Sequence, residues 1–160
     1  MIFVLRVLLI AVSLLIDTSR FLELPFVGAR PMVFIAIVVC FSLRAGALTG
    51  GAWGFSSGLA LGVFFADARV GAMTLGGLLA GCVPAYIKGG LFWRNWAGQA
   101  ALGAVGCLLF EGMVMGFSSL RGEFSVGPVV GLARLTVDSV LTGALTPLVF
   151  ILLNRMETRN

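Results

Sequence analysis

The sequence predicts an all-α polytopic membrane protein, a compact bundle of six transmembrane helices, with five as the alternative. Hydrophobic residues make up 59% of the 160 residues and charged residues only 11%, less than half of the ~25% that is typical of a soluble domain. The few charges separate long apolar runs, and 22 glycines recur within them. A soluble chain of this length cannot bury so much apolar surface, because about a third of its unfolded surface stays exposed after folding.

The charged segments predict a single transmembrane domain, 1–160, with spans near 2–16, 32–43, 45–66, 70–87, 97–117 and 129–153. The first run contains one charge, Arg6, and no cleavage signal follows it, so we interpret it as a retained helix rather than a signal peptide. The run 32–43 would extend over only about 18 Å, less than the ~30 Å of a hydrocarbon core. It is therefore short, tilted or re-entrant, which leaves five spans as the alternative and would move the C-terminus outside.

Six spans place both termini on one side of the membrane. That side carries six basic residues, and the other side carries four. The six are Arg6, Arg44, Lys88, Arg94, Arg155 and Arg159, and the four are Arg20, Arg30, Arg69 and Arg121. The positive-inside rule then places both termini in the cytoplasm. The connection KGGLFWRNW at 88–96 has two cations and three aromatic residues, which favours an interfacial anchor, with a contact for filaments as the alternative.

Glycine recurs at every fourth position of the run 45–66. These positions are Gly46, Gly50, Gly54, Gly58 and Gly62. Lipid tails are as apolar as leucine, so helices in a membrane associate through close packing, which small residues permit. The stripe turns by about 40° at each step, as suits a central helix with several neighbours. Two uses stay open, packing within the bundle and docking of a partner's transmembrane helix, because GxxxG alone is a weak motif.

Three ionisable residues, Glu111, Arg134 and Asp138, lie within predicted spans. Such residues cost several kcal/mol unless they are paired. Glu111 and Arg134 would lie at matching depths, about 9 and about 8 Å from the same surface, so we predict that they pair. Asp138 follows Arg134 by one helical turn, so Arg134 could bridge both carboxylates. The cluster is interpreted as an ion-pair lock, an outward-facing polar pocket, or a proton or ion pathway.

No signature of an enzyme is visible. The chain has no histidine, and its three cysteines, Cys40, Cys82 and Cys107, lie singly within apolar runs. No nucleophile therefore has a neighbouring base, and a metal site of the usual nitrogen and sulfur type is not expected. The net charge of +4 comes from scattered residues, which indicate topology rather than nucleic-acid binding. We expect a non-enzymatic protein without cofactor, with the lipid bilayer as its surroundings.

The order of several short motifs resembles the MreD family of bacterial membrane proteins. Arg30-Pro31-Met32-Val33-Phe34 opens a short apolar segment, and Leu43-Arg44 precedes the next one. Gly54-Phe55-Ser56-Ser57-Gly58-Leu59 and then Asp67 follow. The positions that carry the resemblance are Pro31, Arg44, Phe55, Leu59 and Asp67. The resemblance covers the whole chain, although family members often place the aspartate closer to the preceding leucine than Asp67 is to Leu59.

The resemblance implies a non-enzymatic scaffold of the cell-elongation machinery in the bacterial inner (cytoplasmic) membrane, which supports control of cell shape and peptidoglycan synthesis. Its expected partner is MreC, through docking of a transmembrane helix. MreB filaments, the synthase RodA and its transpeptidase would be reached indirectly.

The family is also similar in fold to the substrate-binding subunits of energy-coupling vitamin transporters, so such a subunit is the alternative function. Those proteins often carry alanine at i and i+4 in their first helix, whereas Ala11 is followed here by Leu15. In that alternative Glu111, Arg134 and Asp138 would line the pocket. An ion channel is disfavoured because no polar stripe runs the full length of a predicted span.

Overall fold

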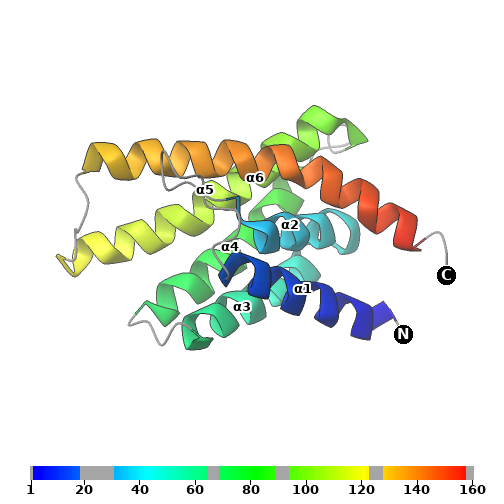
Figure 1. Ribbon diagram of the computed structural model, residues 1–160, viewed down its shortest axis with the longest axis horizontal. Coiled ribbons are helices and arrows are strands. Elements are labelled where there is room, and N and C mark those ends of the chain that lie inside the picture. Colours follow the sequence, from blue (N-terminus) through cyan, green and yellow to red (C-terminus); the bar gives the residue numbers. More distant parts are fainter. Residues whose placement is uncertain (1, 19–30, 65–68, 89–93, 123–127, 158–160) are drawn as a thin grey trace.

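The chain forms six α-helices in the computed structural model, which describes residues 2–18, 31–64, 69–88, 94–122 and 128–157. They are α1 (Ile2–Thr18), α2 (Val33–Ala45), α3 (Ala47–Phe64), α4 (Val70–Ile87), α5 (Trp96–Leu120) and α6 (Pro128–Glu157), as Figure 1 shows. All regular structure in the described ranges is helical, which confirms the all-α prediction. Each helix overlaps one predicted span, so the apolar runs located the helices correctly.

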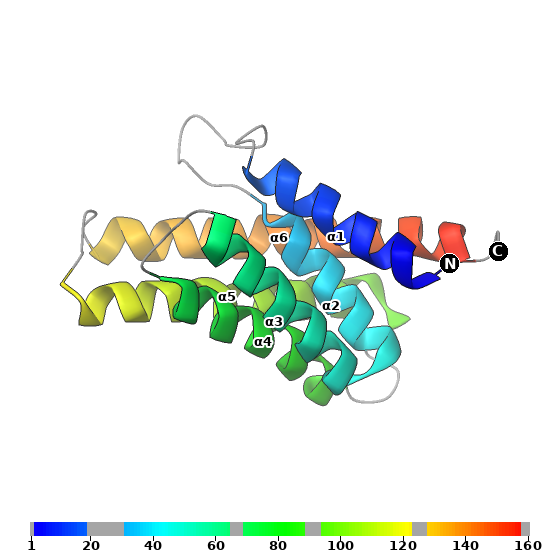
Figure 2. The ribbon, with the colours of Figure 1, turned by 90° about the horizontal axis from the view of Figure 1, so that it is seen from below.

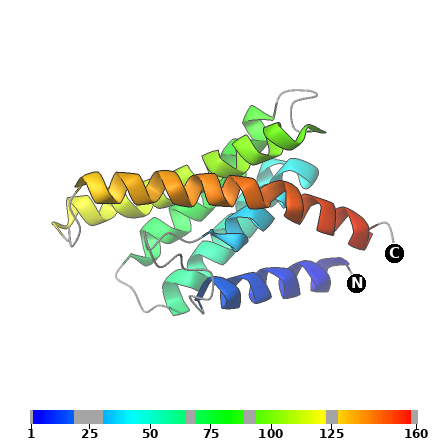
Figure 3. The same ribbon diagram turned by 45° about the horizontal axis from the view of Figure 1, so that its top comes forward.

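The helices alternate in direction along the chain, and α5 and α6 form the longest antiparallel pair (Figures 1 and 2). The beginning of α1 and the end of α6 lie at the same end of the bundle in all three views (Figure 3). The helix α6 also packs along α2, on the side of α2 away from α3 and α4.

Three helices are long and apolar enough to cross a membrane, over Val70–Ile87, Trp96–Leu120 and Val130–Arg155. Many large apolar side chains are exposed on the bundle, among them Leu48, Leu120 and Val140. Lipid tails solvate such side chains, whereas water does not. These features support a membrane protein. Six spans are not confirmed, because the apolar parts of α1 and α2 are shorter and α3 is not among the three candidate spans.

The centre of the bundle is α2. All ten residues from Phe34 to Leu43 are buried, none of them more than 5% exposed, and the other five helices all pack against this one. A helix that is apolar all round is typical of such an interior position. The sequence had indicated the glycine helix as central, and this was wrong. Because α2 is enclosed by protein, its length of about 20 Å does not have to match the bilayer.

The glycines of α3 serve packing within the bundle. A Cβ atom added at Gly54 would collide with the carbonyl of Gly77 on α4, and one added at Gly77 would collide with the carbonyl of Gly54. Gly50 and Gly81 oppose one another in the same way. Backbone therefore meets backbone along this contact, as small residues permit in membrane helices.

Gly58 and Gly62 continue the contact, against the backbone of Met73 and against Val70. The four glycines of the stripe that lie within α3 are thus covered by α4. Of the two uses that the sequence left open, the structure supports internal packing.

Gly46, the first glycine of the stripe, has a different role. Its φ is +96°, and nothing lies within 4 Å of the position where its Cβ atom would be. Its N–H donates to the carbonyl of Ser42 at 3.0 Å, which closes the last turn of α2. Glycine is favoured here because other residues rarely adopt a positive φ. Gly46 therefore reverses the chain between α2 and α3 and takes no part in the contact with α4.

We expect Gly54→Ala to destabilise the protein by about 1–3 kcal/mol, the usual cost of overpacking, because the methyl group would push α3 away from α4. The matched control is Gly112→Ala in α5, where nothing lies within 4 Å of the added methyl group. It should leave stability unchanged or raise it, since alanine is a better helix former by up to ~1 kcal/mol. Thermal unfolding of both variants in one detergent checks this. Equal losses in the two variants would contradict the packing described for α3.

Candidate functional site

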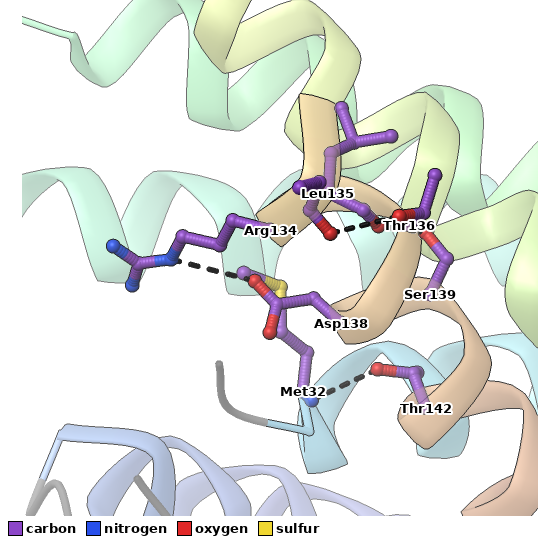
Figure 4. A network of polar contacts seen from close by, with 8 residues as sticks. Met32, Arg134, Leu135, Thr136, Asp138, Ser139 and Thr142 are labelled. Atoms are coloured by element: carbon purple, nitrogen blue, oxygen red, sulfur yellow. Dashed lines mark hydrogen bonds and ion pairs between the residues drawn. The ribbon is translucent and has the colours of Figure 1, made fainter. Parts of the chain in front are cut away.

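The N-terminus of α2 is partly buried and is capped by side chains from two other helices. The N–H groups of Val33 and Phe34 donate to Asp17 Oδ1 at 3.1 Å and to Asp17 Oδ2 at 3.0 Å. The N–H of Met32 donates to Thr142 Oγ1 at 3.0 Å (Figure 4). The first N–H groups of a helix have no partner within the helix. Here α1 and α6 supply the acceptors, and the carboxylate also complements the positive end of the helix dipole.

Two of the three predicted cluster residues form an ion pair next to this cap. Arg134 Nε lies 3.6 Å from Asp138 Oδ2, one turn apart on α6. The Asp138 side chain is 1% exposed and that of Arg134 is 44% exposed. In Figure 4 the carboxylate points toward Met32, and the guanidinium extends away from α6. The predicted proximity of Arg134 and Asp138 is therefore confirmed.

The ion pair that the structure shows for Arg134 is with Asp138, and the predicted pair between Glu111 and Arg134 stays a prediction. Glu111 is half-buried on α5 and has interactions of its own. That prediction is based on matching depth, which does not determine which way a side chain points around its helix. The partner that Arg134 reaches is the carboxylate on its own helix, which residue spacing alone brings near.

Asp138 begins a row of buried polar side chains on α6, which Thr142 and Thr146 continue at intervals of four residues. The Thr146 hydroxyl donates to the carbonyl of Thr142 at 2.8 Å, and the Cys40 thiol of α2 lies 3.8 Å from the carbonyl of Thr146. The next position of the row is Phe150, so the row ends there. Because the row of polar side chains stops at Phe150, a proton or ion pathway along α6 is disfavoured.

The C-terminus of α2 is held by basic side chains. Lys88, which follows α4, donates from Nζ to the carbonyl of Leu43 at 2.9 Å. Arg44 donates from Nη2 to Asn154 Oδ1 on α6, and its Cζ lies 4.5 Å from the centre of the Phe150 ring. The acidic side chain at the N-terminus of α2 and the two cations at its C-terminus each stabilise the helix dipole. Nothing in the spacing of Asp17 and Lys88 along the sequence indicates these roles.

The positions that carry the family resemblance lie in different parts of the fold. Pro31 stands half-buried immediately before the cap of α2, and Arg44 occupies the last turn of that helix. Phe55 and Leu59 are 44% and 42% exposed on α3. Asp67 lies outside the residues that the structure describes.

The polar cluster shows the interactions of a structural lock between helices. Its buried carboxylate is paired with a guanidinium, and its neighbouring hydroxyl groups are bonded to backbone. Among the described residues there is no group of three or more His, Cys, Asp or Glu side chains that could hold a metal ion. The arrangement can fix α1, α2 and α6 relative to one another.

The fold and the cluster define a helical protein of membrane type whose central helix is capped by its neighbours. The chain matches no family model, no curated protein and no solved structure.

We expect Asp17→Ala to destabilise the protein, because the partly buried N–H groups of Val33 and Phe34 would lose their acceptor, and the loss costs up to about 1–3 kcal/mol for each fully buried group. The stability of Asp17→Asn should lie between that of this variant and that of the wild type, since the amide keeps one acceptor oxygen. Thr136→Ala is the control, because the exposed Thr136 hydroxyl bonds only within its own helix, to the carbonyl of Ala133. The measurement is the unfolding midpoint in detergent, and an Asp17→Ala midpoint equal to that of the control would contradict the capping role.

Proposed function

We propose that the chain is a non-enzymatic scaffold of the bacterial cell-elongation machinery, similar to the MreD family, and that it binds the transmembrane helix of MreC. The observation that carries the proposal concerns Phe55 and Leu59. Both are among the positions of the resemblance, and both lie exposed on α3 while the glycines between and beside them face α4.

The exposed face of α3 suits a single-span helix. Leu48, Phe55, Leu59 and Val63 are all exposed, and their spacing of seven, four and four residues places them along one side of the helix. Packing against α4 accounts for the glycines of the motif, whereas contact with a partner accounts for its two exposed apolar side chains. The partner therefore docks on a side of α3 that is turned by about 100° around the helix axis from the glycine stripe, since Phe55 and Leu59 each directly follow a glycine of the stripe.

The proposed topology has six spans, with both termini in the cytoplasm and the bundle in the inner membrane. The beginning of α1 and the end of α6 lie at the same end of the bundle, which supports an even number of crossings. Arg44, Lys88 and Arg94 gather at that same end, as the positive-inside rule requires of a cytoplasmic end. In this topology MreC links the bundle to MreB filaments on one side and to RodA and its transpeptidase on the other.

The test is recovery of MreC when the tagged chain is purified from membranes in detergent. We expect the double variant Phe55→Ala/Leu59→Ala to reduce recovery about tenfold or more, because interface anchors each contribute more than about 1 kcal/mol. The matched control is Val140→Ala/Leu148→Ala, which trims two exposed apolar side chains on α6.

The control variant should recover MreC as the wild type does, with both variants present in the membrane at wild-type amounts. Equal recovery by the two variants would place the partner on another face. Wild-type purification that yields no MreC, but yields the coupling subunit and ATPases of a transporter, would replace the scaffold by the substrate-binding alternative.

A further inference from the structure

A pocket of about 570 Å³ opens at the end of the bundle where α2 terminates. Arg44 of α2, Arg94 before α5, and Asn154 of α6 contribute to its lining. The volume lies within the range of ~300–1,000 Å³ that is usual for small-molecule sites. This pocket is separate from the predicted polar cluster, which lies at the opposite end of α2.

The pocket is built to receive an anion. None of the described residues that line it is acidic, and two of them are arginines. The guanidinium of Arg44 is held in place by the amide oxygen of Asn154 and by the Phe150 ring, so little freedom is lost when it binds. The planar guanidinium group offers paired donors that match two phosphate oxygens. Gln99, nearly fully buried, adds an amide to the polar part of the lining.

Another part of the lining is apolar, which distinguishes a lipid from a soluble anion. Phe150 and Ile151 of α6 and Trp96 of α5 contribute this part. The Trp96 side chain is largely exposed, and tryptophan is enriched where the headgroups of a bilayer meet its hydrocarbon. An inorganic anion has no apolar groups that could contact this part of the lining, whereas a phospholipid presents a phosphate next to glycerol and acyl chains.

We infer that this pocket binds the phosphate of an acidic phospholipid from the leaflet at the Arg44 end of the bundle, with Arg44 and Arg94 as the partners of the anion. Basic pockets between membrane helices on the cytoplasmic side are suited to such headgroups. The inference depends on membrane insertion and on the pocket, and it does not depend on the proposed scaffold function.

The experiment is native mass spectrometry of the purified full chain in detergent, titrated with phosphatidylglycerol, with phosphatidylcholine and with inorganic phosphate. We expect phosphatidylglycerol to bind more tightly than the other two. Arg94→Gln should weaken its binding about fivefold, the size of effect that one basic residue has on attraction to acidic lipid. Arg94→Lys should restore most of the binding, because the charge returns.

Arg155→Gln is the matched control, since Arg155 is exposed near the same end of α6 and does not line the pocket. It removes the same charge and should leave the affinity within about twofold of the wild type, because the attraction falls off with distance from the charge. Arg94 is chosen over Arg44 because it is exposed and does not hold α2.

If Arg94→Gln and Arg155→Gln weakened phosphatidylglycerol binding equally, the effect would come from general surface charge, and the proposed binding in the pocket would be wrong. Equal binding of the two phospholipids would overturn the preference for an acidic one. Displacement of phosphatidylglycerol by millimolar inorganic phosphate would assign the pocket to a soluble anion instead.

Discussion

The structure depends on one constraint, which is that a helix enclosed on all sides must have the backbone groups at both of its ends satisfied by protein. The residues of α2 from Phe34 to Leu43 are at most 5% exposed, and an unsatisfied buried N–H or carbonyl costs as much as several surface contacts contribute. Asp17 and Thr142 meet this need at the N-terminus, and Lys88 meets part of it at the C-terminus. These bonds tie α1, α6 and the end of α4 to the same central element. The same hydrogen bonds therefore cap α2 and determine how the other helices are arranged around it.

The orientation of α3 is determined by its contact with α4, where glycine carbonyls of one helix lie against the glycine backbone of the other. A close approach of this kind leaves no room for rotation of α3, because any turn about its axis would bring a side chain into the contact. The orientation of α3 is thereby fixed, and Phe55 and Leu59 are directed to the outer surface. In this way, residues that pack inward determine which side chains a membrane partner could meet.

The sequence predicts the six helices well because charges interrupt the apolar runs where the helices end, and it predicts the Arg134–Asp138 pair because a spacing of four residues is a local property of a helix. It does not predict that α2 is central, since an apolar helix surrounded by lipid and one surrounded by protein have the same composition. The sequence does not determine whether Glu111 joins the Arg134–Asp138 pair, because equal depth leaves the direction around each helix open. The caps from Asp17 and Lys88, and the pocket near Arg44, depend on contacts between residues distant in the chain, which spacing does not encode.

Hydrogen exchange of the purified full chain, followed by mass spectrometry, tests the central position of α2 most directly. Backbone amides exchange when a segment opens, and enclosed, fully bonded segments open least. The account predicts that peptides covering Val33–Ala45 exchange more slowly than those from any other described helix, and that this protection includes Val33 and Phe34, where a helix normally frays. Exchange of this first turn as fast as that of the exposed last turn of α3 would show that α2 is neither enclosed nor capped.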